Sequence, residues 1–570
     1  MLRRLRWQIA VMVLALAAIA ILLLSQQPIA QTLIAQPTAG GLYIEGLAGE
    51  LGRLNPLLDY ANQADRDVDR LIFSGLVRFD SKGVPQPDLA ETIGVNVDGD
   101  VYNVSLRSGL LWHDGQPVTS DDVLFTIGLL QDPDMPVAPD LKELWQEVEV
   151  TAFDELTLQF VLPAPFAPFW DYLSFGILPA HLLDGLSATE IVDHSFNLEP
   201  VGTGPYRFEQ LLVEDGRVAG VVLNAVEDYY LDCPDVEEQC PFIDQVVFRY
   251  FATSADAMTA YRSGEILGIG HISEDILAEA MADPNLNVYT SRLPELSLVL
   301  FNLDNSAVSF LQDESVRRAL WQGLNRQRMI DTLLNGQAVI ADSPIFPGTW
   351  AHFDEIQQIT FAREAAISLL KSAGYTIPAE GGNVRVNEEG ARLEFEMLYP
   401  DDELHRAIAE YIQSDWRLLG VAVELVPVDY ETMLAEYLDP RDYEAALIDL
   451  NLMASPDPDP YPFWHQAQVT GGQNYSYWDD RRASEYLEQA RVNPRIEERT
   501  RLYRNFQVHF SRELPAVLLF YPVYSYGVDA QVQGVRVGPL FEPSDRFLNV
   551  SEWFLLARGR LEDVNEPASE

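Results

Sequence analysis

Polar and hydrophobic residues follow two different spacings along this chain, and the two spacings alternate. Strict alternation predicts strands at 101–106 (VYNVSL), 156–161 (LTLQFV) and 421–428 (VAVELVPV). Hydrophobic residues at helical spacing predict helices at 316–334, 406–419 and 497–513. The near-continuous hydrophobic run 298–303 (LVLFNL) predicts a strand buried on both faces. Strands and helices interleaved in this way predict a mixed α/β fold.

The segment 112–123 (WHDGQPVTSDDV) predicts a turn that leads into a helix. Asp114 and Gly115 form a turn pair, Thr119 is a suitable N-cap, and Asp122 stands in the position that completes a capping box. These residue types all have a reason to be there as turn and cap residues, so we expect this segment to be structural.

The N-terminus carries three arginines, followed by an unbroken hydrophobic run over residues 9–24. Sixteen helical residues extend about 24 Å, somewhat less than the ~30 Å hydrocarbon core of a bilayer. Arginines before such a run keep that end in the cytoplasm, so the body of the chain is exported. We expect residues 1–41 to form an uncleaved anchor and tether; a cleaved signal peptide is the alternative. The last residues, 561–570, are expected to be a frayed acidic tail.

The charge balance narrows the range of partners. The chain of 570 residues has 38 Lys and Arg against 87 Asp and Glu, a net charge of −49. A surface this negative repels phosphate backbones, which excludes nucleic acid as a partner. A hydrophobic content of 48% excludes a disordered acidic chain, and the length predicts two or more lobes. We expect a monomer.

Cys233 and Cys240 stand in a loop rich in proline and acids (CPDVEEQC). In an oxidising compartment we expect them to form a disulfide bond; two unpaired thiols are the alternative. Two cysteines are too few for a disulfide scaffold or a four-cysteine metal site.

The sequence contains no pattern that predicts catalysis. None of the eight histidines has a paired metal-ligand spacing, and nucleophile-elbow and phosphate-loop motifs are absent. Acid pairs such as 121–122 and 401–402 stand where helices are expected to begin, which favours helix starts over acid/base pairs. We therefore expect no enzyme, no cofactor and no metal site.

A series of motifs in a fixed order carries a family resemblance. They are LNP (54–56), LIFSGLVRFD (71–80), PDLAE (87–91), VYNVSLRSGLLWHDGQPVTSDDV (101–123), LPAH (178–181), GTGPYRF (202–208), VRRALWQGLNRQRMID (316–331), SPDPDPYPFWHQAQ (455–468), NYSYW (474–478) and FYPVYSYGV (520–528). This order resembles the family 5 solute-binding proteins of ABC importers, the oligopeptide-, dipeptide- and nickel-binding proteins. The resemblance covers roughly residues 42–555.

The resemblance implies a two-lobe periplasmic-binding-protein-like fold of type II, in the large class with an extra subdomain. Mixed sheets with flanking helices would form the lobes, and a hinge would join them. The first lobe would be residues 42–290, with the extra subdomain at about 76–200. The second lobe would be residues 291–520, and residues 521–560 would return to the first lobe. Ligand would lie between the lobes.

The resemblance also implies where ligand binds. Peptide-binding members hold the peptide's amino terminus with an Asp, and the matching position here falls on Met453 or Ala454. Dipeptide-type members hold the carboxylate with an Arg, and that position is Tyr399. Both losses weaken a short-peptide interpretation. They do not exclude a longer peptide held mainly through its backbone, and they also suit an uncharged ligand such as a sugar or another amphipathic compound.

Further ligand contacts are expected on both lobes. In the first lobe, Asn62 and Gln63 match a stretch that approaches ligand in the family. In the second lobe the expected contacts are Asn451, Asp457, Trp464 and Tyr475. Aromatic walls are usual in ligand clefts. For Asp457, as for Asp459, the alternative is a solvated acid in a proline-rich turn.

Together these features predict an extracytoplasmic solute-binding protein, in the periplasm or on the outer face of the cell membrane, tethered by residues 9–24. It would deliver a peptide or other organic solute to the transmembrane subunits of an ABC permease. A tethered sensor of the same fold without a transport role is the alternative. An extracellular hydrolase is a third hypothesis, and the lack of any nucleophile or metal motif argues against it.

Overall fold

The computed structural model describes residues 39–231, 240–453 and 456–556. The hydrophobic run 9–24, the acidic tail 561–570 and Cys233 lie outside these ranges. Among the described helices, none combines the length and the apolar character needed to cross a membrane. Residues Ala39–Leu555 form one compact unit.

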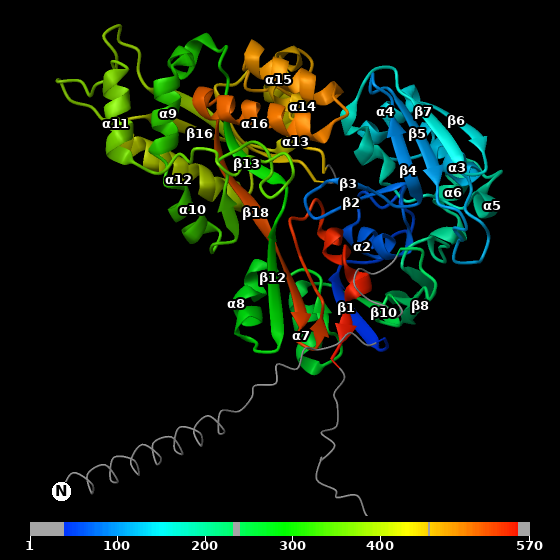
Figure 1. Ribbon diagram of the computed structural model, residues 1–570. Coiled ribbons are helices and arrows are strands. Elements are labelled where there is room, and N and C mark those ends of the chain that lie inside the picture. The colour runs from blue at the N-terminus through cyan, green and yellow to red at the C-terminus, as the bar shows by residue number, and fades with distance from the viewer. Residues whose placement is uncertain (1–38, 232–239, 454–455, 557–570) are drawn as a thin grey trace, which may run out of the picture. The chain divides into compact units, whose positions relative to one another are not determined.

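The largest element of the fold is a twelve-stranded sheet that takes strands from both halves of the chain (Figure 1). Its strands are β1 (Leu42–Ala48), β8 (Tyr206–Glu214), β9 (Arg217–Ala225), β10 (Gln245–Phe251), β11 (Gly268–Ile269), β12 (Leu286–Arg292), β13 (Glu295–Phe301), β14 (Ala338–Ile340), β15 (Glu394–Pro400), β16 (Ala422–Val428), β17 (Ala445–Asn451) and β18 (Ala516–Asp529). The order is β16-β15-β17-β13-β18-β11-β1-β10-β9-β8, and β12 and β14 also pair with β18. Parallel and antiparallel pairs both occur, so the predicted mixed α/β fold is confirmed.

Strand β18 joins the two halves of this sheet. Its first part pairs antiparallel with β13, and its second part, from Val523 to Asp529, pairs antiparallel with β12. Fourteen extended residues span roughly 45 Å, which is long enough to serve two packed layers of structure. Strand β12 leads almost directly into β13, and both pair with β18. The halves of the sheet are therefore connected by β18 and, next to it, by the passage from β12 to β13 (Figure 1).

Three smaller sheets complete the set of strands in the described residues. Strands β4 (Ala90–Val95), β5 (Val101–Leu106), β7 (Thr157–Val161) and β6 (Glu149–Asp154) form a four-stranded antiparallel sheet in that order. The pairs β2 (Val77–Phe79) with β3 (Pro85–Pro87) and β19 (Val532–Gln533) with β20 (Phe554–Leu555) are two-stranded. Strands β5 and β7 confirm the strands predicted at residues 101–106 and 156–161.

Helices cover the sheets. The α-helices are α2 (Gln63–Ile72), α3 (Ser120–Gln131), α4 (Pro139–Glu147), α5 (Ala180–Leu183), α6 (Ala188–Val192), α7 (Ser254–Ser263), α8 (Glu274–Ala282), α9 (Glu314–Gln322), α10 (Arg326–Leu333), α11 (Arg363–Ser372), α12 (Glu403–Leu419), α13 (Tyr430–Thr432), α14 (Tyr461–Trp464), α15 (Arg481–Val492) and α16 (Ile496–Glu513). Short 3₁₀ or π segments are η1 (Ala167–Leu173), η2 (Ser195–Asn197), η3 (Ser306–Gln312), η4 (Met433–Leu438), η5 (Gln466–Val469), η6 (Pro543–Phe547) and η7 (Val550–Glu552). The capping box of Thr119 and Asp122 is formed at the start of α3, as predicted.

Two of the three long predicted helices are confirmed as α12 and α16. The third prediction, one helix over residues 316–334, is wrong, because the segment is two helices. Helix α9 ends at Gln322, and Asn325 begins α10 by accepting a hydrogen bond from the backbone N–H of Arg328. The Asp415 carboxylate also accepts from the N–H of Asn325, at 2.9 Å, which fixes the break.

Two large hydrophobic cores divide β18 between them. The C-terminal core contains the side chains of β13, β15, β17, α9, α12 and α16 and the β18 residues from Ala516 to Tyr521. The N-terminal core contains β1, α2, the four-stranded sheet and the β18 residues Tyr524, Tyr526 and Val528. The division between the cores thus falls at Pro522 and Val523, in the middle of the strand.

Candidate functional site

One cavity of about 300 Å³ takes its walls from segments that pack on both cores. On one side lie the β2–β3 hairpin, including Phe79, and Trp170 of η1, both of which pack on the N-terminal core. On the other side lie Trp350, which packs on the C-terminal core, and residues 494–497 with Arg499, around the start of α16. A second hollow of about 660 Å³ adjoins it through Pro494 and Arg495. Aromatic rings on opposing walls suit the apolar parts of an organic ligand.

A buried ion pair forms the floor of this cavity. Asp457 and Arg499 are 5% and 4% exposed. The guanidinium of Arg499 donates to both carboxylate oxygens of Asp457, with Nη2 to Oδ1 at 2.7 Å, and its Nε donates to the carbonyl of Ala490 at 2.8 Å. Although burial opposes the positive charge, Asp457 raises the pKa of Arg499. The alternative interpretation of Asp457 as a solvated turn residue is therefore wrong.

Hydrogen bonds tie the two walls together. The backbone N–H of Asp457 donates to a carboxylate oxygen of Asp171 in η1 at 3.0 Å. The backbone N–H of Trp350 donates to the carbonyl of Lys82, in the β2–β3 turn, at 2.9 Å. At Gly83 in the same turn φ is +77°, and an added Cβ would lie 2.7 Å from the ring of Phe541. The hairpin therefore needs a glycine to approach the C-terminal side this closely.

Asp459, two residues further along, is half-buried, and its carboxylate has fewer partners than that of Asp457. Its Oδ2 lies 3.2 Å from Nε of Arg491, and its other oxygen has no hydrogen-bond partner among the described residues. Burial raises the pKa of Asp459 to about 6, against the opposing charge of Arg491. The guanidinium of Arg491 also lies 5.1 Å from the ring of Phe166 and 4.4 Å from that of Tyr461. The charged form of this carboxylate is therefore costly.

A second polar group lies at the carboxyl end of β17; we call it the β17 cluster. It consists of Ser297, Asp402, His405, Tyr430 and Asp449. Nε2 of His405 lies 2.8 Å from Oδ2 of Asp449, and its Nδ1 lies 2.6 Å from Oδ2 of Asp402. Ser297 donates to the other oxygen of Asp449, and Tyr430 donates to its carbonyl at 3.2 Å. Burial opposes the charge of His405, but Asp449 and Asp402 together raise its pKa.

The predicted second-lobe residues next to this cluster have different environments. Tyr399 is buried in β15, within the C-terminal core. Asn451 is the exposed last residue of β17, and its side chain accepts from the backbone N–H of Met453 at 2.9 Å. Met453 is half-buried, and Ala454, the other position considered for the missing Asp, lies outside the described residues. Their contacts with ligand stay predictions.

Trp464 and Tyr475 do not line the cavity. Trp464 is 2% exposed and packs edge-on against Phe510 with the ring centroids 4.8 Å apart. Tyr475 donates to Asp439 at 3.2 Å, and the guanidinium of Arg441 lies 4.6 Å from its ring. Both side chains have partners within the C-terminal half, so a ligand role for them stays a prediction.

Asn62 and Gln63 begin α2. The Asn62 side chain accepts from the backbone N–H of Ala64 at 3.0 Å and donates to the carbonyl of Glu50 at 3.0 Å. The Gln63 side chain donates to Asp67 at 2.8 Å. These contacts are structural, and neither residue lines the cavity.

The disulfide prediction also stays open, since Cys233 lies outside the described residues.

The residues that the sequence did not indicate are Trp170, Trp350 and Arg499. The two tryptophans stand in short irregular segments, where no periodicity assigns a side chain to a face. For Arg499 a signal existed. It shares a helix face with Leu502, Phe506 and Phe510, and a charged residue on a hydrophobic face usually has a buried partner.

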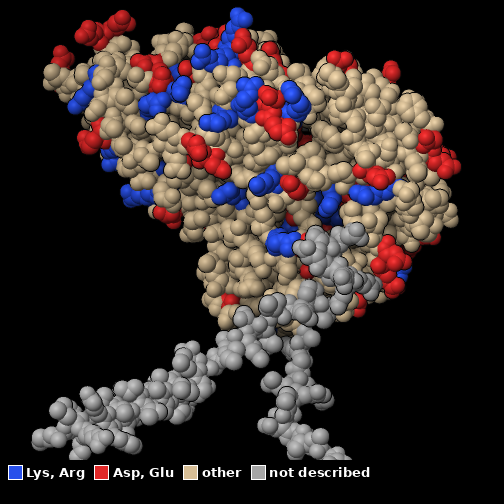
Figure 2. Space-filling model, viewed as in Figure 1, with Lys and Arg blue, Asp and Glu red and all other residues tan. Residues whose placement is uncertain are grey.

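Acidic and basic side chains are interspersed on the face shown in Figure 2, rather than collected in one patch. The net charge is therefore not concentrated around one site on this face. The fold and the cavity together give a mixed α/β protein with a hollow lined from both hydrophobic cores.

Comparison with known proteins identifies the family. The model of the bacterial extracellular solute-binding proteins, family 5 Middle, matches residues 84–474. This chain belongs to that family; it is a solute-binding protein and not an enzyme.

Its relatives include peptide-binding proteins. The oligopeptide-binding protein AppA of Bacillus subtilis (strain 168) is 23% identical over 91% of this chain and 92% of its own length. The dipeptide-binding protein of Escherichia coli (strain K12) is 26% identical over 82% of this chain and 86% of its own. The structure of AppA from Bacillus subtilis in complex with a nonapeptide has a TM-score of 0.61, 23% identity, and covers 91% of this chain and 100% of that one. It shows the same fold.

Proposed function

We propose that this protein captures a peptide or another organic solute between two lobes and delivers it to an ABC transporter permease. The observation that carries the proposal is the cavity with walls from both cores. The lobes we propose are residues 42–290, with an extra subdomain at about 76–200, and residues 291–520, with a return through residues 521–560. The division of β18 at Pro522 and Val523 between the two cores supports this boundary.

Lobe closure is the proposed mechanism of capture. Two antiparallel strands, β18 and the β12–β13 passage, connect the halves of the sheet, and a small change in them would rotate one core against the other. The hydrogen bonds of Asp457 to Asp171 and of Trp350 to Lys82 would form on closure and break on opening. Ligand binding would favour the closed arrangement because it adds contacts to both walls.

The side chains favour a ligand held without terminal charges. The guanidinium of Arg499 donates to Asp457, to the Ala490 carbonyl and to the Tyr503 hydroxyl, so it has its partners within the protein rather than in a ligand carboxylate. At the family's two end-binding positions, Met453 and Tyr399 stand in place of an Asp and an Arg. Trp170 and Trp350 offer rings to an apolar side chain or the face of a sugar. A peptide held through its backbone and an uncharged solute such as a sugar both agree with these side chains, and the related AppA, whose structure contains a nonapeptide, supports the peptide class.

Ligand screening with matched variants tests the proposal. Melting temperature is measured for the full-length protein with pools of di-, tri- and longer peptides and of sugars. We expect at least one pool to raise it, and Trp350→Ala and Trp170→Ala to weaken binding at least tenfold. Phe153→Ala, which removes an exposed aromatic ring from β6, is the control and keeps full affinity. No response to any pool, or equal binding by all three variants, contradicts the proposal.

We further propose that the protein is exported and stays tethered to the membrane by residues 9–24. The basic residues before this run and the extracellular family support export. The N-terminal residue of the protein isolated from cells tests the tether: Met1 supports it, and a start between residues 31 and 40 shows cleavage. Co-purification with permease subunits separates transport from the alternative, a sensor of the same fold.

A further inference from the structure

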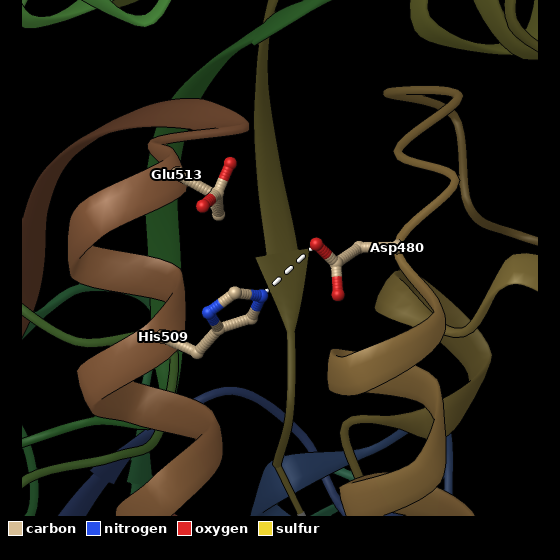
Figure 3. A group of neighbouring side chains, drawn as sticks. All are labelled: Asp480, His509 and Glu513. Atoms are coloured by element: carbon tan, nitrogen blue, oxygen red, sulfur yellow. Dashed lines mark hydrogen bonds and ion pairs between the residues drawn. The ribbon is translucent and has the colours of Figure 1, made fainter.

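Three potential metal ligands converge outside the cavity, where the first residues of α15 meet the last turn of α16. They are Asp480, His509 and Glu513 (Figure 3). One ligand atom from each lies within 4.8 Å of the others, and Nε2 of His509 is 2.9 Å from Oδ2 of Asp480. Among the described residues, no other trio of His, Cys, Asp or Glu side chains meets this criterion.

The local structure holds these donors in position. His509 and Glu513 are four residues apart on α16, so they lie one turn apart on the same helix face, as Figure 3 shows. Asp480 is the N-cap of α15, and its Oδ1 accepts from the backbone N–H of Ala483 at 2.8 Å. That bond leaves Oδ2 directed at the imidazole. The indole of Trp478 stacks near the His509 ring, with centroids 6.1 Å apart and planes at 29°, which restrains the ring.

The charges of the group favour a cation. Two carboxylates face one imidazole, and in the described part of the chain no hydrogen bond or ion pair engages the Glu513 carboxylate. Arg317 and Arg318 lie nearby and oppose a cation, but their guanidinium groups are directed at the main-chain carbonyls of Glu513 and of Arg512. The side chains are half-buried: His509 is 12% and Asp480 is 21% exposed. Water can therefore reach the group and supply a further ligand.

We propose that Asp480, His509 and Glu513 bind a divalent transition metal ion of the Zn²⁺ type. Oδ2 of Asp480, Nε2 of His509 and one oxygen of Glu513 would be the protein ligands, with water in the fourth position. This donor set of one imidazole and two carboxylates is one that Zn²⁺ accepts, with bonds of about 2.0–2.2 Å. Tetrahedral ligands at such distances lie about 3.3 Å apart. The His–Asp pair, at 2.9 Å, is already near that separation, and the Glu513 oxygen, within 4.8 Å of the other two ligand atoms, would have to move closer by rotation of its side chain.

The ion would fasten the start of α15 to the end of α16. Arg499, on the cavity floor, lies ten residues before His509 on the same helix, a distance of about 15 Å along the axis. The metal site is therefore separate from the proposed solute site. The β17 cluster also combines a histidine with two carboxylates, but there the carboxylates face opposite ring nitrogens of His405 and do not converge on one point.

Zinc binding to the full-length protein tests the proposal. The protein is treated with EDTA, dialysed against buffered ZnSO₄, and its metal content measured together with its melting temperature. We expect one tightly bound Zn²⁺ and a rise in melting temperature. His509→Gln and Glu513→Gln should each weaken binding at least tenfold. His352→Gln is the matched control, because His352 pairs with a single exposed carboxylate, that of Asp354, and should bind zinc like the wild type.

The possible results of these measurements distinguish the metal site from the proposed solute site. No bound zinc in the wild type, or equal zinc binding by the wild type and His509→Gln, overturns the proposal. Circular dichroism of each variant shows whether it is folded, and Glu513→Gln keeps the size of the side chain in case the histidine variant unfolds. The peptide response is measured on the same samples. If it persists while zinc binding fails, only the metal site is refuted.

Discussion

Arg499 and Asp457 form a two-point ion pair that is almost completely buried, at the floor of a cavity lined from both cores. The pair joins the first turn of α16 to the proline-rich segment that comes after β17. Both walls of the cavity depend on it, because the backbone N–H of Asp457 also donates to the Asp171 carboxylate. Removing one partner leaves an uncompensated buried charge.

We therefore predict that Asp457→Asn lowers the free energy of unfolding by about 3 kcal/mol. Chemical denaturation measures the loss. The control is Asp401→Asn, which removes half of the exposed pair with Arg406 and should cause no measurable change. Equal stabilities of Asp457→Asn and the wild type would show that the buried pair has no net stabilising role.

Gly202 offers a test of close packing in the N-terminal half. A Cβ at this position would lie 2.0 Å from the carbonyl oxygen of Ile72, so no side chain fits. Gly202→Ala should destabilise the protein by more than about 3 kcal/mol, in the range of severe core overpacking. Gly128, in the interior of α3, has no atom within 4 Å of its added Cβ, and Gly128→Ala should stabilise by about 0.5–1 kcal/mol. Thermal unfolding of the two variants gives the comparison, and destabilisation of both by the same amount would contradict it.

Asp459 makes stability depend on pH. Burial raises its pKa in the folded protein to about 6 from the ordinary 3.8, so the folded state binds this proton more tightly than the unfolded state. The stability contributed by this group is then highest below pH 4 and falls as the pH rises to about 6. A shift of this size corresponds to about 3 kcal/mol. In Asp459→Asn, the difference in unfolding free energy between pH 4 and pH 7 should shrink by about this amount; an unchanged pH profile would disprove the assignment.

His405 acts in a higher pH range. Its pairing with Asp449 and Asp402 raises its pKa in the folded state above the ordinary 6.5, despite the opposing effect of burial. Its contribution to stability is fully present below pH 6.5 and is lost as the pH rises through the raised value. Denaturation between pH 6 and pH 9 should show this loss in the wild type. The same series on His405→Gln should be flatter, and two parallel profiles would count against the ion pairs.

Much of the fold could be predicted from the sequence. The alternating segments that form β5 and β7, the capping box of Thr119 and Asp122, and the helix ended by Gly420 all depend on local residue patterns. The break between α9 and α10 could not be predicted because the hydrophobic positions continue through it. Its cause is a contact with Asp415, some ninety residues further along the chain.

The site was less predictable than the fold, because its residues also depend on contacts that are distant in the sequence. The sequence indicates Asp457 as a candidate, either as a ligand contact or as a solvated turn residue. Neither interpretation includes the buried ion pair, because its partner Arg499 is distant in the sequence. Trp464 is expected at the cleft because it is aromatic and belongs to the family segment 455–468, yet its ring packs on Phe510. Trp350 reaches the cavity through a loop whose direction is set by tertiary contacts, including its bond to Lys82.

The proposed function depends above all on enclosure of a solute between Trp170 and Trp350, above the Asp457–Arg499 pair. Native mass spectrometry of gently purified full-length protein is the sharpest test of this enclosure, since it needs no prior choice of ligand. We predict an additional bound mass of an organic solute on the wild type and its loss from Trp350→Ala, with the Phe153→Ala control retaining it. A wild type without any bound solute that also fails to take one up from the peptide and sugar pools, or the same bound mass on Trp350→Ala, would contradict enclosure at this site.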